Sequence, residues 1–212
     1  MTAPCPLYLA SSNLGKRREF HLAAAPWGYE VRILPGFDRI PPCIEDGTTF
    51  EENARKKALY YSASTSAMVF ADDSGIRVDA LGGDPGVLSA RFAGPHATDA
   101  ENNMRLLHEL ARRPGASRSA QYVCVIALAA RRQLLGVFEG MVAGVIMDLP
   151  RGSGGFGYDP YFYYPPAGKT FAELTPDEKF EVSHRGVAFR KLLNFLALQN
   201  AAPRSPAPRL TG

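Results

Sequence analysis

The sequence is poor in the residues from which disulfide frameworks and zinc sites are built. It holds three cysteines and four histidines among 212 residues. Cys5, Cys43 and Cys124 are scattered and form no Cys-x-x-Cys pair, so we expect reduced thiols in a cytoplasmic protein. The histidines show no zinc-ligand spacing, which argues against a zinc enzyme.

Long apolar runs and a large excess of one charge are also missing. No run approaches the ~20 residues of a membrane span, and we expect no signal peptide. Lys and Arg total 24 against 21 Asp and Glu, a net charge of +3. That excess is too small to argue for a nucleic acid or a membrane as partner, whereas a small anionic substrate is compatible with it.

Apolar residues make up 46% of the chain, and their pattern predicts one α/β domain with a mixed sheet over residues 1–200. Strands are expected at 7–11, 29–34, 67–72, 76–81, 120–130 and 133–147. The last two should form an antiparallel pair covered by helices on both faces. The proline-containing tail 201–212 is expected to be disordered.

Two helices are predicted from capping boxes, at Thr49–Glu52 and at Thr98–Glu101. The inward face of the first is expected to hold Phe50, Ala54, Ala58 and Tyr61, and that of the second Met104, Leu107 and Ala111.

Two adjacent carboxylates, Asp72 and Asp73, directly follow an apolar strand. Adjacent aspartates repel each other and are poor strand formers. Asp-Asp-Ser-Gly is also an ordinary surface turn, but its position after a buried strand favours a bound cation.

Two further stretches place cations where a phosphate could bind. Ser11, Ser12, Asn13, Gly15 and Lys16 lie where a strand passes into a helix, whose free N–H groups attract anions. The alternative is that Ser12 or Asn13 only caps the helix. Glu45 and Lys57 flank the start of the next helix, where a solvated loop followed by a charged helix face is the alternative.

A glycine-rich loop follows the second long strand. Gly152, Gly154 and Gly157 match G-x-G-x-x-G, but prolines follow instead of a helix, so we reject a dinucleotide fingerprint. The loop carries Phe156 and Tyr158, which could enclose a flat ring. Lys179, His184 and Arg185 lie near a helix start, where a lone histidine is more often a cap or surface residue.

Six blocks in order make the sequence resemble the inosine triphosphate pyrophosphatase family, over most of residues 7–195. They are SSNLGKRREF, GTTFEENARKKA, FADDSGIRVDALGGDPGVLSARFAG, GGFGYDPYF, KTFAELTPDEK and SHRGVAFRKLL. The resemblance implies a mixed central sheet flanked by helices, two lobes with a cleft between them, and a homodimer. It also implies Mg²⁺-dependent hydrolysis of noncanonical purine nucleoside triphosphates (ITP, dITP, XTP) to the monophosphate and pyrophosphate.

The resemblance also assigns roles to residues. Asp73 would be the proton acceptor and, with Glu45, a metal ligand, and Asp72 stands beside them as a third metal candidate. Substrate would be bound by Ser11, Ser12, Asn13, Leu14, Gly15, Lys16, Lys57, Ser74, Phe156, Gly157, Tyr158, Asp159, Lys179, His184 and Arg185. Lys16 and Lys57 would neutralise the leaving pyrophosphate.

Base choice is expected to depend on Arg185, which can only donate hydrogen bonds. Facing position 6 of a purine, it would donate a hydrogen bond to a keto oxygen and oppose the amino group of adenine. Two other functions stay open: a nucleotide pyrophosphatase of broader specificity, and a nucleotide sensor that binds without hydrolysis. The acids Glu45, Asp72 and Asp73 count against the sensor, since binding alone could use Lys and Arg.

Overall fold

The computed structural model describes residues 5–201. The predicted disordered tail therefore lies outside the described residues, except for Ala201 at the end of the last helix. Among residues 5–201, no helix has the combined length and apolar character needed to cross a membrane.

One mixed sheet of seven strands runs through the molecule, in the order β2-β1-β3-β4-β5-β6-β7. Strand β1, next to the edge strand β2, is parallel to β2 and β3, and the other neighbours are antiparallel. The strands are β1 Cys5–Leu9, β2 Tyr29–Ile33, β3 Val69–Val78, β4 Ser119–Ala130, β5 Gln133–Ile146, β6 Phe162–Tyr164 and β7 Lys169–Thr170. The predicted mixed α/β fold is confirmed.

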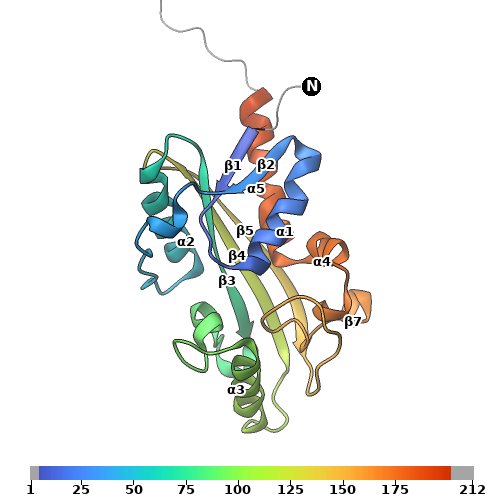
Figure 1. Cartoon of the computed structure of the whole chain (residues 1–212). Helices are drawn as coiled ribbons and strands as arrows, with labels where there is room; N and C mark the ends of the chain where they lie inside the picture. Colours follow the sequence, from blue (N-terminus) through green and yellow to red (C-terminus); the bar gives the residue numbers. More distant parts are fainter. Residues whose placement is uncertain (1–4, 202–212) are drawn as a thin grey trace, which may run out of the picture.

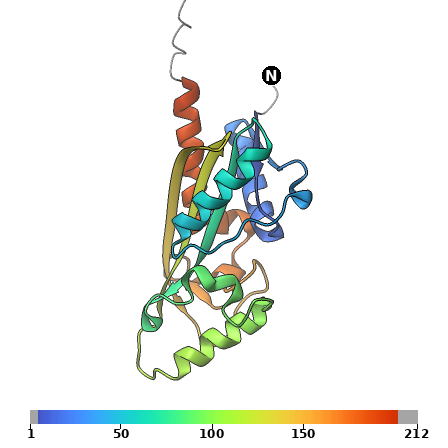
Figure 2. The same cartoon turned by 90° about the vertical axis from the view of Figure 1, so that its left-hand side faces the viewer.

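Helices cover this sheet in layers. They are α1 Leu14–Ala24, α2 Phe50–Tyr61, α3 Asp99–Ala111, α4 Pro176–Val182 and α5 His184–Ala201. Helices α1 and α5 pack on one face through a cluster around Phe20, Phe70 and Phe189, whereas α2 packs on the other face. Figures 1 and 2 show α2 and α5 on opposite sides of the sheet, with α3 at the far end of the long strands.

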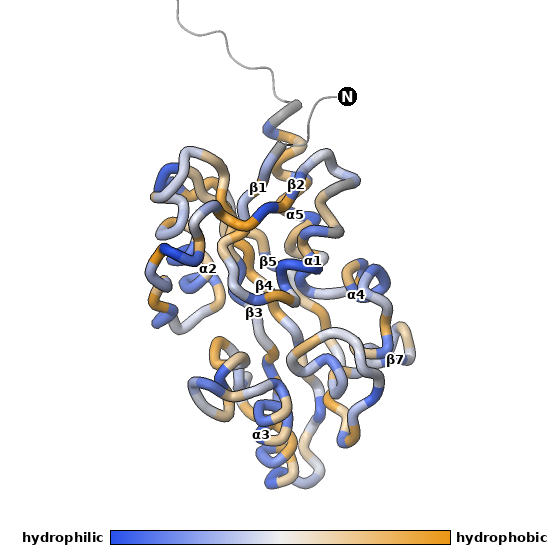
Figure 3. Tube along the Cα trace, in the orientation of Figure 1, coloured by the Kyte–Doolittle hydropathy of each residue, from blue (hydrophilic) through white to orange (hydrophobic). Residues whose placement is uncertain are grey.

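A third cluster fills the part of the molecule that contains α3, β6 and β7, around Ile76, Tyr122 and Phe162. Apolar colours are frequent along the strands, and α3 alternates between polar and apolar stretches, as expected for a helix with one face on the third cluster (Figure 3). The long strands β3, β4 and β5 therefore connect two packed regions, one with α1, α2 and α5 and the other with α3.

The prediction of two strands separated at the acids was wrong. Strand β3 continues through Asp72 and Asp73 and pairs with β4 along its whole length, from Val69 opposite Ala129 to Val78 opposite Ala120. Pairing with a long, buried partner strand outweighs the poor strand propensity of aspartate, because that propensity depends strongly on context.

The two capping boxes are confirmed, and so is the buried face of α2. The inward face predicted for α3 is confirmed only at Leu107, which packs against the third cluster, while Met104 and Ala111 are exposed. Asn102 and Asn103 are buried instead. Asn102 accepts a hydrogen bond from the Ala93 N–H (2.8 Å), and Asn103 donates one to the Gly157 carbonyl (2.8 Å). Helix α3 thus turns two asparagine side chains inward, where they bond to backbone groups of loops that have no partner in a helix or sheet.

On its α2 face, strand β5 is covered only in part, contrary to the prediction for the long pair. Leu134 and Val137 pack against the α2 cluster, whereas Glu139 and Met141 further along the strand are exposed. The opposite face meets α5, which approaches so closely that a Cβ at Gly140 would lie 2.1 Å from the His184 carbonyl oxygen. Gly140 therefore fixes how deep the start of α5 sits on the sheet.

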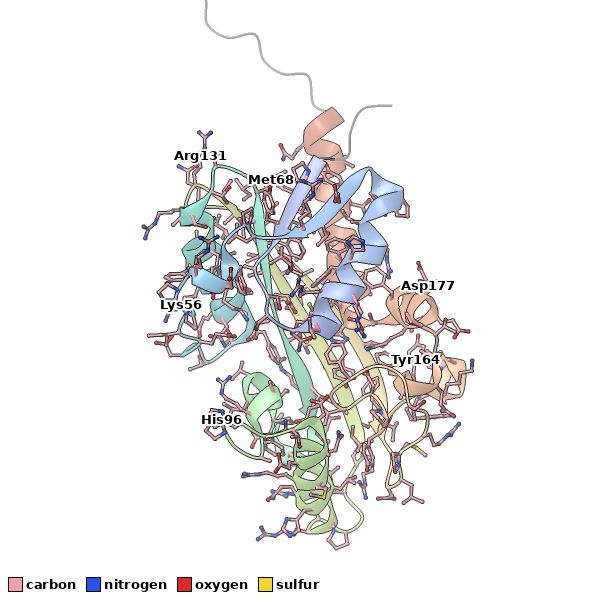
Figure 4. All side chains as sticks on the ribbon, viewed as in Figure 1. Lys56, Met68, His96, Arg131, Tyr164 and Asp177 are labelled. Carbon is pink, nitrogen blue, oxygen red and sulfur yellow. The ribbon has the colours of Figure 1, made fainter. Side chains whose placement is uncertain are left out.

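The β4–β5 hairpin has a turn of unusual composition. Its two turn residues, Arg131 and Arg132, have φ of 49° and 64°. Both are left-handed conformations that a two-residue hairpin turn needs and that Asn and Gly adopt at lower cost. Arg131 projects from the end of the hairpin (Figure 4), and the Arg132 N–H donates to Ser62 Oγ at 3.1 Å.

We predict that replacing this pair by Arg131→Asn and Arg132→Gly stabilises the protein by about 1 kcal/mol, because the backbone strain is relieved. Urea unfolding measures the change. The control is the double replacement by alanine, which removes the same charges but keeps both β-carbons. An alanine pair as stable as the Asn-Gly pair would contradict the role assigned to backbone strain.

Candidate active site

A gap in the pairing of the sheet creates the main cavity. Strand β1 pairs with β3 only at Val69 and Phe70, so the edge of β3 beyond Phe70 is open. Further along, this edge is closed again by loops: the Ile76 N–H donates to Ser89 Oγ (2.9 Å) and the Val78 N–H to the Asp84 carbonyl (3.1 Å). Between these points, beside residues 72–75, lies a cavity of about 370 Å³.

Segments from both packed regions line the cavity: the start of α1, the loop before α2, the 3₁₀ helix η5 (Gly86–Arg91), loop 156–159 and the junction of α4 and α5. All site residues predicted from the sequence line it, except Leu14 and Gly15. Leu14 is exposed. Gly15 lies against the Phe156 ring, 2.5 Å from where its own Cβ would be, so its missing side chain admits an aromatic ring.

The start of α1 is capped by its own side chain and also lines the cavity. Asn13 Oδ1 accepts a hydrogen bond from the Lys16 N–H at 3.0 Å, which caps the helix. Ser11, Ser12, Asn13 and Lys16 nevertheless all line the cavity. Lys16 Nζ lies 2.8 Å from Asp72 Oδ2, which places the lysine ammonium between the helix start and β3.

The two adjacent aspartates point to opposite faces of β3, as successive strand residues do. Asp72 is fully buried with Lys16 and Arg185, whereas Asp73 meets Lys57 and Asn53 from α2. Each acid therefore has its own cation from the chain, and no shared ion is needed to hold the pair together. Asp72 does not join Glu45 and Asp73 in one group.

The different surroundings move the pKa values of the two acids apart. Burial alone would raise the pKa of Asp72, but the charges of Lys16 and Arg185 outweigh it, and the pKa lies below its usual value. Burial also raises the pKa of Asp73, and Lys57 offsets only part of that effect. Asp72 is thus a permanent counterion, and Asp73 the acid whose side chain is partly open to the cavity.

Glu45 joins Asp73 at the α2 side of the cavity. Lys57 Nζ lies 2.7 Å from Glu45 Oε2 and 3.3 Å from Asp73 Oδ1. Asn53 Nδ2 donates to Asp73 Oδ2 (3.1 Å), and Asn53 Oδ1 accepts from the Gly47 N–H (2.8 Å), which ties the Glu45 loop to α2. The capping box of α2 therefore begins the helix that supplies both groups facing Asp73.

This corner fits a divalent cation in the chemistry of its donors, although no cluster of three or more His, Cys, Asp or Glu is arranged for a metal among residues 5–201. Glu45 and Asp73 are hard oxygen donors that already share one positive charge, the Lys57 ammonium. Two protein carboxylates suffice for Mg²⁺ when phosphate oxygens and waters complete its shell.

At the other end of the cavity, buried side chains of opposite charge alternate. Lys179 Nζ lies 2.5 Å from Asp159 Oδ2 and 2.7 Å from Glu19 Oε1, and Glu19 also pairs with Arg185. Phe156 covers these cations, with its ring centroid 4.7 Å from Lys179 Nζ and 5.4 Å from Arg185 Cζ. An aromatic face over fixed cations offers a flat ligand both stacking and hydrogen-bond donors.

Arg185 and His184 are both buried at the start of α5. The Arg185 guanidinium donates to Ser74 Oγ at 3.0 Å, while its Nε has no hydrogen-bond partner. The His184 ring stacks on Tyr122 at 4.6 Å and 7°, and its Nδ1 has no partner. Burial and then the charges of Arg185 and Lys179 keep the pKa of His184 well below its usual value, so the ring is neutral.

Sequence reasoning missed several residues that shape the cavity. Glu19 holds two of the predicted cations, and its only sequence signal is its place one helical turn after Lys16. Tyr158 was predicted to enclose a ring, but its hydroxyl donates to the Ser89 carbonyl (2.7 Å), and Asp99 accepts from the Gly157 N–H (2.6 Å). These bonds fasten the glycine-rich loop to η5 and α3.

Comparison with known proteins places the chain among enzymes of one kind. The Ham1 family matches residues 7–195. A dITP/XTP pyrophosphatase of Syntrophobacter fumaroxidans is 49% identical over 186 residues, 88% of this chain and 79% of the relative. A dITP/XTP pyrophosphatase of Thermus thermophilus is 50% identical over 186 residues, which cover 87% of this chain and 88% of the relative. The structure of a HAM1 protein from Coxiella burnetii aligns with a TM-score of 0.83 at 39% identity, covering 92% of this chain and 99% of that one.

We predict that His184 makes stability depend on pH below about 6.5, the usual pKa of an unfolded histidine. Its folded pKa is lowered, so stability is fully present above pH ~6.5 and is lost as the pH falls, by up to about 1.4 kcal/mol per pH unit. Urea unfolding of the wild type and of His184→Phe from pH 7.5 to 5.5 measures this slope. The variant should have the shallower slope, and exposed His108→Gln should keep that of the wild type. Equal slopes in all three proteins would contradict the prediction.

Proposed function

The chain is a member of the Ham1 family, and from that membership we propose that it hydrolyses noncanonical purine nucleoside triphosphates (ITP, dITP and XTP) to the monophosphate and pyrophosphate. The names of the relatives, dITP/XTP pyrophosphatase, support this activity. The observation that carries it is one cavity with a helix start and lysines at one end, two carboxylates in the middle and an aromatic ring over cations at the other.

The layout of the cavity supports one orientation for the substrate. The purine would lie at the Phe156 end, between the ring and the donors of α4 and α5. The α-phosphate would lie beside Asp73, and the start of α1 with Lys16 and Lys57 would meet the phosphates. Free N–H groups at a helix start and lysine ammonium groups both favour phosphate oxygens.

In the proposed reaction, Asp73 accepts a proton from a water that attacks the α-phosphorus. The bond from that phosphorus to the bridging oxygen breaks, and pyrophosphate leaves with the electron pair. Lys16 and Lys57 neutralise the charge that develops on the leaving group. Mg²⁺, held by Glu45 and Asp73, would supply further charge neutralisation at the phosphate oxygens.

Base choice would rest on the cations beneath Phe156. The Arg185 guanidinium lines the cavity beneath Phe156 and carries only hydrogen-bond donors. A 6-keto oxygen can accept from such a donor, whereas the 6-amino group of adenine would leave it unpaired, at a cost of about 1–3 kcal/mol. This supports a preference for hypoxanthine and xanthine over adenine.

Assembly and location belong to the same proposal. We expect a homodimer, and the exposed face of β5 with Leu135 and Met141 is apolar surface that a second copy could cover. The free thiols Cys43 and Cys124 support a reducing compartment, the cytoplasm.

We predict that ITP incubated with the protein and Mg²⁺ yields IMP and pyrophosphate. Ion-exchange chromatography of the nucleotides, with separate assays for pyrophosphate and orthophosphate, measures the products. EDTA should stop the reaction and added Mg²⁺ should restore it. IDP with orthophosphate as first products would refute the pyrophosphatase, and binding of ITP without any turnover would favour the sensor.

We predict that Asp73→Asn lowers kcat by about 10²–10⁴-fold, because the amide cannot accept the proton. The fold should persist, since an asparagine can still pair with Asn53, and thermal unfolding checks this. Asp79→Asn makes the same change at an exposed acid outside the cavity and should leave kcat unchanged. Turnover of Asp73→Asn within a few-fold of the wild type would remove Asp73 from the mechanism.

A further inference from the structure

Five basic side chains line the cavity, and one of them differs from the others. Lys16, Lys57, Lys179 and Arg185 each have a carboxylate within 4 Å. Arg91, the last residue of η5, has no acidic partner among residues 5–201. Arg91 lies in one of the six blocks that carry the family resemblance, but it was not predicted as a site residue.

The guanidinium of Arg91 is held loosely. It is half-buried, and its contact is a hydrogen bond from Nη2 to the Glu45 main-chain carbonyl at 3.5 Å, the long limit for such a bond. A neutral acceptor at that distance compensates a positive charge only weakly. An anionic oxygen at 2.7–2.9 Å would bind the guanidinium about twice as strongly.

The backbone around Arg91, by contrast, is fixed. Asn102 donates to the Ala90 carbonyl (3.2 Å) and accepts from the Ala93 N–H (2.8 Å), so one buried side chain pins both sides of Arg91. Ser89 Oγ accepts from the Ile76 N–H and donates to the Gly86 carbonyl (2.6 Å), which fastens η5 to β3. A rigid backbone that carries a weakly held cation is suited to receive a ligand at little cost in ordering.

Its neighbours show which end of the cavity Arg91 serves. It touches the main chain of Glu45, whose side chain pairs with Lys57, and Lys57 reaches Asp73. The cations beneath Phe156 form a separate group with Glu19 and Asp159. In the orientation proposed for the substrate, Arg91 therefore lies beyond Asp73, on the side away from the purine.

We propose that Arg91 binds the terminal phosphate of the triphosphate and so selects for the pyrophosphate leaving group. The proposal rests on the proposed function for the substrate's orientation. Because η5 belongs to the region with α3, and Lys57 and Lys16 belong to the opposite region, the triphosphate would be held from both sides. A diphosphate lacks the phosphate that Arg91 reaches.

The first experiment compares ITP with IDP in the wild type, Arg91→Ala, Arg91→Lys and Arg112→Ala. Arg112, the C-cap residue of α3, is exposed outside the cavity and makes a 3.9 Å ion pair with Glu109. Its replacement by alanine is therefore the matched loss of one positive charge. Arg91→Ala should lower kcat/KM for ITP at least tenfold and leave that for IDP within about twofold. Arg91→Lys should recover part of the loss, and Arg112→Ala should match the wild type. If IDP is not hydrolysed, its inhibition constant replaces kcat/KM.

Equal losses for ITP and IDP in Arg91→Ala would overturn the proposal and make Arg91 a residue that positions Glu45 through its carbonyl. No loss for either substrate would overturn it as well. Activity of the wild type on ITP tests the proposed function separately, because the Arg91 result is a ratio between variants.

The second experiment does not depend on turnover. Calorimetry measures binding of inorganic tripolyphosphate, without metal, to the wild type, Arg91→Ala and Arg112→Ala. We expect binding to Arg91→Ala to be at least tenfold weaker than to the other two proteins. Equal binding by all three, or no binding by the wild type, would count against a phosphate site at Arg91.

Discussion

The site depends on a chain of buried charges that alternate in sign from one end of the cavity to the other. In order, it consists of Lys16, Asp72, Arg185, Glu19, Lys179 and Asp159. Removing charges from water costs several kcal/mol for each ion, and only well-placed partners repay it. Since α1, β3, α4, α5 and loop 156–159 each supply a member, the chain constrains how these elements pack. Replacing one member by a neutral residue would leave a partner uncompensated.

This compensation also explains how two adjacent acids coexist in the middle of a strand. Asp72 belongs to the buried chain, and Asp73 belongs to a separate group with Glu45, Lys57 and Asn53 on the other face. The first group is neutral in the free protein and rigid. The second contains two carboxylates and one ammonium, so it has room for one more positive charge. The alternation of side chains along the strand thus places Asp72 in the buried charge chain and Asp73 in the group that faces the cavity.

Local patterns predicted much of the fold. Together with the family resemblance, they also predicted a set of site residues that all line the cavity, except for Leu14 and Gly15. The capping boxes at Thr49 and Thr98, strand β2 and the long β4–β5 pair follow from short-range chemistry. The continuity of β3 could not be predicted, because its pairing partner β4 is distant in the sequence. The burial of Asn102 and Asn103 could not be predicted either, because it depends on the loops to which they bond. Glu19 and Arg91 escaped notice because their roles depend on which charges meet in space. The order of blocks identified the family where no single motif could.

Strands β3, β4 and β5 run without interruption from the region of α2 and α5 to the region of α3, and this continuity limits how the molecule can deform. Because β3, β4 and β5 are hydrogen-bonded to one another along their length, they resist bending. A large change in the distance between the two packed regions would require these strands to bend. The width of the cavity should therefore be set by the backbone of these three strands, whatever enters it.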